Sequence, residues 1–171
     1  MASARQQEFL DLIQSNSGII HKVIRLYVDG TEDQRDLYQE IVAQAWGSFS
    51  RFAGNSKFST WLYRVALNTA LTFQKKAQKR KGNRSATEND LPTVPPASDF
   101  ETRELLLWAI RHLVEADRMI ILLHLEGYDN GEISDISGIN KNHVGVKLHR
   151  IKKKLTALLQ PYRYGSERTV E

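Results

Sequence analysis

Hydrophobic and polar positions recur with helical spacing in two parts of the chain. Apolar residues return every three or four positions, without sustained strict alternation and without a hairpin turn between β-branched runs. The pattern therefore predicts an all-α protein. Helices are expected over residues 5–15, 18–28, 32–50 and 57–80 in the first part, and over residues 100–113, 116–126, 130–137 and 141–160 in the second.

A polar segment, residues 82–99, lies between the two parts. It reads GNRSATENDLPTVPPASD, holds three of the four prolines and has no helical period. This composition is typical of a linker. The sequence therefore predicts two small helical domains, residues 1–81 and 100–165, joined by a flexible connection.

Several residues mark the expected helix ends. Thr31, which precedes EDQRD, is a candidate N-cap, and Asn140 is a candidate cap for the last helix. Gly127 and Gly138 are expected to end the two helices before them. Residues 53–56, AGNS, are expected to form a turn.

The helix expected over 57–80 begins within SKFSTWLYRVALNTA and mixes aromatic residues with cations. At 100° per residue its buried face is expected to hold Phe58, Leu62, Val65, Thr69 and Phe73. A polar, basic stripe beside it is expected to hold Arg64, Asn68, Lys75 and Lys79. Trp61 falls on the seam between these two faces, and Tyr63 points elsewhere.

This arrangement has two interpretations. Aromatic rings beside cations suit unstacked bases, because rings stack on bases while cations hold phosphates. Alternatively, Phe58 is an ordinary core residue and Trp61 is half-buried with its N–H outward. The stretch 75–84 holds six basic residues and no acid, so it either continues the phosphate-binding stripe or forms a solvated face.

The stretch GEISDISGINKNHVGVKLHRIKKKL predicts a helix-turn-helix. The last helix separates a buried face from a basic face. Its buried face is expected to hold Val144, Leu148, Ile151, Leu155 and Leu158. Asn142 and His143 could reach base edges, and Lys147, Arg150 and Lys154 could hold phosphates or bases. An ordinary helical hairpin with a solvated basic face is the alternative.

The helix expected over 32–50 carries an acidic face. Its acids are Glu32, Asp33, Asp36 and Glu40. A DNA-binding protein gains nothing by turning this face to phosphate. The acids are therefore either solvated or a docking surface for a basic protein partner.

Composition excludes several classes of function. The net charge of +4 is a mild basic excess, and the absence of cysteine is compatible with a reducing compartment. No signal peptide and no membrane-spanning run is evident. The five histidines lack metal-ligand spacing, and no glycine-rich phosphate loop or nucleophile–base set is present. We therefore expect no enzyme activity, cofactor, metal or small-molecule substrate.

Two long strings resemble the extracytoplasmic-function group of bacterial RNA polymerase sigma factors. DLYQEIVAQAWGSFSRF followed by GNSKFSTWLYRVALNTA resembles their region two, and residues 105–155 resemble their region four. The resemblance implies a cytoplasmic transcription initiation factor. It implies binding to the β′ clamp and β flap of core RNA polymerase and to promoter DNA, both duplex and single-stranded. An anti-sigma factor is a further partner in many relatives.

The resemblance also implies roles for individual residues. Asp36, Gln39, Glu40 and Gln44 would face the polymerase clamp. Minus-ten contacts would come from Asn55, Ser56, Lys57, Phe58, Ser59, Trp61, Arg64 and Asn68, with Lys75 and Lys79 continuing the stripe. Minus-thirty-five contacts would come from Lys141, Asn142, His143, Lys147, Arg150 and Lys154.

The sequence departs from the family pattern at three positions. Many members have a basic residue where Gly145 stands, and apolar residues are more usual at Ser134 and Ser137. The rival interpretation is a stand-alone helix-turn-helix regulator that binds duplex DNA. It leaves the aromatic-basic stripe and the acidic face unexplained.

Overall fold

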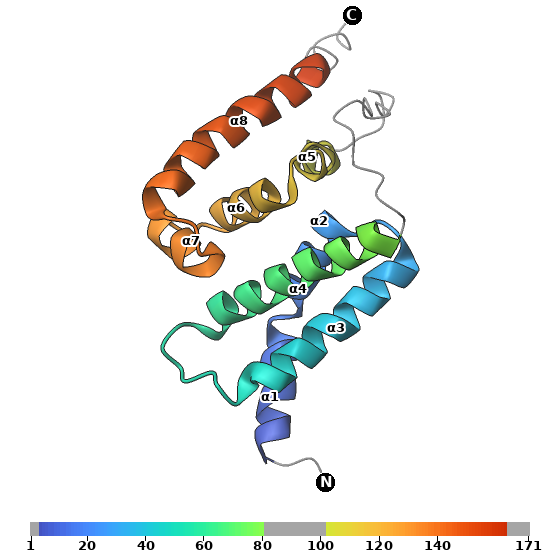
Figure 1. Cartoon of the computed structure of the whole chain (residues 1–171), viewed down its shortest axis with the longest axis vertical. Helices are drawn as coiled ribbons and strands as arrows, with labels where there is room; N and C mark the ends of the chain where they lie inside the picture. Colours follow the sequence, from blue (N-terminus) through green and yellow to red (C-terminus); the bar gives the residue numbers. More distant parts are fainter. Residues whose placement is uncertain (1–3, 81–101, 164–171) are drawn as a thin grey trace, which may run out of the picture. The chain divides into compact units, whose positions relative to one another are not determined.

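The computed structural model describes residues 4–80 and 102–163, and these form eight α-helices and no strand (Figure 1). The first unit contains α1 (Ala4–Ser15), α2 (Ser17–Tyr27), α3 (Thr31–Phe49) and α4 (Phe58–Arg80). The second unit contains α5 (Thr102–Arg111), α6 (Glu115–Leu125), α7 (Asn130–Ser137) and α8 (Lys141–Arg163). The prediction of an all-α fold is confirmed. The expected linker, residues 82–99, lies outside the described residues.

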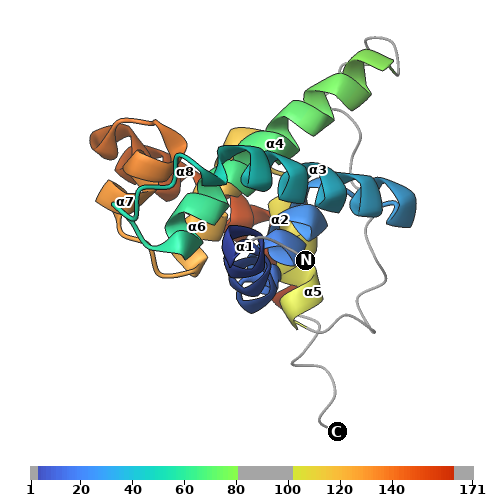
Figure 2. The same ribbon diagram turned by 90° about the horizontal axis from the view of Figure 1, so that it is seen from below.

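The core of the first unit lies where α4 packs against both α2 and α3. Ile20, Leu37, Ile41 and Leu62 are fully buried there. Figures 1 and 2 both show α3 and α4 side by side. This antiparallel pair places the acidic face of α3 next to the polar face of α4.

Tyr63 is a correction to the sequence analysis. The helical wheel placed it outside the buried face, but its side chain is only 2% exposed. The reason is that α4 contacts two helices, so it buries a wider arc than a helix that packs on one neighbour. Ala66, Leu67 and Ala70 are buried on the same added arc.

The start of α3 is a second correction. Thr31 is the first residue of the helix, and Gly30 is the N-cap, with extended backbone angles of φ −73° and ψ 138°. The Gly30 carbonyl accepts the first helical hydrogen bond from the Gln34 N–H at 2.9 Å. The Gln34 side chain also donates to the Val28 carbonyl at 3.1 Å. A threonine that is already helical cannot act as the cap.

The second unit is built around α8, which packs against α5, α6 and α7. Ile120, Leu123, Ile133 and Ile151 are fully buried among these helices. Gly127 and Gly138 have φ angles of +88° and +75°, so both expected glycine stops are confirmed. None of the described helices is long and apolar enough to cross a membrane.

Candidate nucleic-acid interface

Four aromatic side chains form a cluster where α3 ends and α4 begins. Trp61 lies 5.2 Å from Phe52, 5.2 Å from Phe58 and 6.3 Å from Phe49, measured between ring centroids. Phe58 and Trp61 are both half-buried. The three phenylalanine rings pack against part of the Trp61 indole, and the rest of the indole faces solvent. The geometry thus combines the two interpretations of Trp61, since a packed ring still offers exposed area for stacking.

The connection between α3 and α4 runs beside this aromatic cluster. Gly54 has a φ of +72°, which allows the turn there. Asn55, Ser56 and Lys57 are exposed, and Ser59 is half-buried within the first turn of α4. The predicted base-holding segment therefore runs from an exposed loop into the first turn of α4, beside the aromatic cluster.

The predicted basic stripe lies on the exposed face of α4. Arg64, Asn68, Lys75 and Lys79 are all exposed, as the wheel predicted. The stripe begins within one helical turn of Trp61 and extends along the helix. The structure thus brings the aromatic and cationic residues onto one side of α4, as an opened strand would require.

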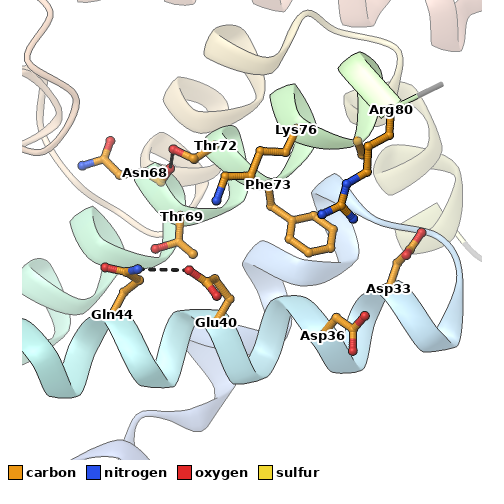
Figure 3. Close-up of a pocket in the computed structure, with 11 residues that line it drawn as sticks. Asp33, Asp36, Glu40, Gln44, Asn68, Thr69, Thr72, Phe73, Lys76 and Arg80 are labelled. Atoms are coloured by element: carbon orange, nitrogen blue, oxygen red, sulfur yellow. Dashed lines mark hydrogen bonds between the residues drawn. The ribbon is translucent and has the colours of Figure 1, made fainter. Parts of the chain in front are cut away.

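A groove with a volume of about 570 Å³ lies between α3 and α4 (Figure 3). One wall is acidic, with Asp33, Asp36 and Glu40 from α3, and the other carries Lys76 and Arg80 from α4. Phe73 forms part of the floor between these walls. The groove therefore offers opposite charges to a partner that lies along it.

Three of the four predicted clamp-facing residues line this groove. Asp36, Glu40 and Gln44 follow one another at four-residue spacing, and the Gln44 amide donates to Glu40 Oε1 at 3.0 Å (Figure 3). Gln39 is exposed but is not among the residues that line the groove. Asn68, predicted to support the opened strand, lines the opposite wall.

The sequence analysis did not assign the basic wall of this groove to the same site as the acidic wall. Lys76 and Arg80 follow Asn68 and Thr72 at four-residue spacing, so they share one face of α4. The four-residue spacing is visible in the sequence. The sequence does not show that this face of α4 lies opposite the acidic residues of α3.

The second unit contains the predicted helix-turn-helix, formed by α7 and α8. Gly138 ends α7, and its N–H donates to the Ser134 carbonyl at 2.8 Å. The Asn140 side chain accepts from the Asn142 N–H at 2.9 Å, so the expected cap of α8 is confirmed. Val144, Leu148, Ile151 and Leu155 are buried, and Leu158 is half-buried.

Five of the six predicted upstream-contact residues are exposed on α8. These are Lys141, Asn142, His143, Arg150 and Lys154. Lys147 differs, because its ammonium lies 3.0 Å from Oδ1 of Asp117, a buried residue at the start of α6. Its Nζ is thus committed to a contact within the protein. This ion pair joins α8 to α6, the helix that precedes the helix-turn-helix.

The structure shows the surroundings of the three residues that depart from the family pattern. The Ser137 hydroxyl accepts from the Ile139 N–H at 3.2 Å, and Ser134 is half-buried. A Cβ added at Gly145 would meet the Asn130 amide at 3.5 Å, an ordinary contact distance. Position 145 therefore faces α7, and the space there would hold a side chain of alanine size.

Asp129 caps α7 in a reciprocal arrangement. Its carboxylate accepts from the Gly131 N–H at 2.7 Å and the Glu132 N–H at 2.9 Å, while Glu132 accepts from the Asp129 N–H at 2.9 Å. The N–H groups of Glu132 and Gly131 lower the pKa of Asp129 from its ordinary 3.8, and nearby Lys141 lowers it further. The charged form is therefore favoured in the folded state.

We expect Asp129→Ala to lower the melting temperature at neutral pH, because two N–H groups of α7 lose their acceptor. Since folding lowers this pKa, the contribution is present above the unfolded value near 3.8 and is lost as pH falls through the folded pKa. The difference in melting temperature from the wild type should shrink in that acidic range. Asp129→Asn is the matched control, since it keeps the cap without the titration. A difference that is constant down to the acidic range would contradict the assignment.

Two family models match the chain in the order of its two units. The sigma-70 region 2 model matches residues 7–80, which cover α1 to α4 almost completely. The sigma-70 region 4 model matches residues 103–155, which include the helix-turn-helix. The chain is therefore a sigma-70-type protein with two regions. With the relatives described next, it belongs to the extracytoplasmic-function group of RNA polymerase sigma factors.

Several curated relatives align with most of the chain. It is 26% identical to the RNA polymerase sigma factor NccH of Alcaligenes xylosoxydans xylosoxydans, over 93% of this chain and 90% of NccH. It is 29% identical to the ECF sigma-E factor of Escherichia coli, over 82% of each. The match to ECF sigma factor SigG of Mycobacterium tuberculosis, 25% identical, covers 72% of this chain but only 41% of SigG.

Two solved structures share the fold. The sigma factor RpoE from Bartonella quintana, solved with the anti-sigma factor NepR, aligns with a TM-score of 0.66 and 18% identity over 90% of this chain and 95% of RpoE. CnrH, solved with the cytosolic domain of CnrY, aligns with a TM-score of 0.65 and 20% identity over 91% of this chain and 90% of CnrH. At this identity the likeness shows the fold.

Proposed function

We propose that this chain directs core RNA polymerase to promoters and opens them. The observation that carries the proposal is the juxtaposition on α4 of the aromatic cluster around Trp61 with the cationic stripe from Arg64 to Lys79. A duplex reader has no use for such a surface, whereas a protein that captures an unpaired strand needs both groups. The proposed domains are residues 1–81 for polymerase and minus-ten binding and residues 100–165 for minus-thirty-five binding.

Each step is assigned to residues of this chain. The segment Asn55–Ser59 holds a flipped base of the minus-ten element, and Trp61 stacks beside it. Arg64, Lys75 and Lys79 hold the backbone of the opened strand. No covalent step is involved, so the factor is not an enzyme and acts in the cytoplasm beside the polymerase. Stacking and pocket contacts offset the few kcal/mol lost on unpairing.

The acidic wall of the groove is assigned to the polymerase β′ clamp. Asp36, Glu40 and Gln44 line the wall, and Gln39 extends it on the exposed neighbouring face. Region four binds the minus-thirty-five duplex through α8 and contacts the β flap. An anti-sigma factor is a further proposed partner, supported by the RpoE–NepR complex on the same fold.

A charge reversal tests the polymerase contact. Glu40→Lys is expected to weaken binding of the full chain to core RNA polymerase by about tenfold or more, because like charges juxtaposed at an interface cost several kcal/mol. Fluorescence anisotropy of the labelled chain measures the affinity. Glu8→Lys, the same change at an exposed position of α1, is the control and should bind as the wild type does. Equal weakening by both variants would show a general charge effect and overturn the assignment of the groove.

A further inference from the structure

Val146 is an exposed apolar side chain in the middle of a polar surface. It is 51% exposed, and it is the large hydrophobic residue that the described part of α8 leaves in solvent. Its neighbours on the same face are Asn142 one turn before it and Arg150 one turn after it, with His143 beside them, all exposed. At 100° per residue, Val146 points about 160° away from the buried residues Val144 and Leu148.

Exposure alone says little, because single apolar residues are common on protein surfaces. Its position is what carries the argument. Val146 lies in the second turn of α8, in the half of a recognition helix whose residues meet base edges in the major groove. Valine is β-branched and a weaker helix former than alanine, so it adds nothing to the helix itself. We therefore look for a binding partner that Val146 contacts on this face of α8.

In the major groove of DNA, one chemical group is suited to contact an apolar side chain. Base edges there present hydrogen-bond donors and acceptors, and the C5-methyl group of thymine is the apolar feature. Valine has no side-chain donor or acceptor, so opposite any other edge it would desolvate polar atoms without pairing them. Building on the proposed function, we propose that Val146 contacts a thymine methyl group in the upstream duplex and makes that position specific for thymine.

The structure holds this side chain in a fixed direction. The Asn140 cap sets the start of α8, and the burial of Val144, Leu148 and Ile151 against the neighbouring helices fixes its rotation. Because the buried face is fixed, Val146 on the opposite side of the same helix keeps a constant direction toward solvent. A rigid element of this kind presents a specificity residue more precisely than a loop does.

The test is a comparison of thymine with deoxyuridine, which lacks only the methyl group. Upstream duplexes are first selected from a random library with the full-length chain bound to core RNA polymerase. Each thymine of the selected duplex is then replaced singly by deoxyuridine, and affinity is measured. One thymine is expected to lose about three- to fivefold on replacement, the effect of one buried methyl group. In Val146→Ala this ratio should fall toward one, because the methyl group has lost its partner.

Lys154→Ala is the control for an unspecific loss of binding. It should weaken the thymine and deoxyuridine duplexes equally and keep their ratio. Selective binding in which Val146→Ala keeps the wild-type ratio, or in which no thymine is sensitive, would overturn the assignment of Val146 alone. If the selection yields no preferred duplex, the proposed role of region four fails and this inference falls with it.

Discussion

The Trp61→Ala variant is expected to open promoter DNA roughly ten- to a hundredfold less efficiently than the wild type, since a base stacked on an aromatic ring contributes about 1–3 kcal/mol. Duplex binding by α8 should be unaffected, because it belongs to the other unit. Permanganate reactivity of minus-ten thymines, measured with core RNA polymerase present, gives the extent of opening. Trp61→Phe should retain most of the activity, since a ring remains.

Trp61 also packs on Phe52 and Phe58, so its truncation can destabilise the first unit. Trp46→Ala separates the two effects. Trp46 is a second half-exposed indole that packs on Phe9 at 5.1 Å and on Phe49 at 6.4 Å, and no role in strand capture is assigned to it. A folded Trp61→Ala variant that opens DNA as well as Trp46→Ala does would contradict the stacking role.

The Ile151→Ala variant is expected to lose about 2–5 kcal/mol of unfolding free energy in the second unit. Ile151 is fully buried where α8 meets α5, α6 and α7, so truncation leaves a cavity that the surrounding helices fill only partly. Urea denaturation followed by circular dichroism measures the loss. Ile151→Val should lose only about 0.5–1.5 kcal/mol.

A substitution at the adjacent, exposed position provides the control for this measurement of stability. Lys152→Ala, at the next and exposed position, should stay within about 0.5 kcal/mol of the wild type. Duplex affinity should fall in Ile151→Ala as the second unit unfolds, and it should recover at lower temperature. If Ile151→Ala were as stable as Lys152→Ala, the packing of α8 described above would be incorrect.

Helix positions followed from the sequence because they depend on local signals. The ends at Gly127 and Gly138 were predicted because a positive φ favours glycine, and the Asn140 cap because its side chain bonds only two residues away. Thr31 shows the limit of the same reasoning. Several residues near a helix start can serve as the cap, and the backbone at Gly30 decided which one does.

Features that depend on tertiary packing were not predicted. Tyr63 is buried because α4 has two neighbours, and one helical wheel cannot show how many helices will surround it. The Lys147–Asp117 pair joins residues 30 positions apart, so the sequence pattern could not show it. Lys147 was therefore predicted as a contact to DNA. The acids of α3 were recognised as one face, but their opposition to Lys76 and Arg80 required the α3–α4 pairing.

The roles of the individual site residues remain proposals drawn from the resemblance and from the geometry. The predicted basic stripe of α4 and five of the six predicted contact residues of α8 are exposed. Gln39 does not line the groove, and Lys147 is paired with Asp117. Lys147 would have to leave Asp117 before it could hold a phosphate. Its contribution to DNA binding is thereby expected to be smaller than that of exposed Arg150.

The most direct test of the central claim is a map of transcript starts. The purified chain is mixed with core RNA polymerase and genomic DNA from its host, and new transcript ends are sequenced. The account predicts a small set of new starts that share two spaced upstream motifs. A chain that neither binds core polymerase nor redirects transcript starts, and yet shifts duplex DNA by itself, would contradict the account and favour a stand-alone helix-turn-helix regulator.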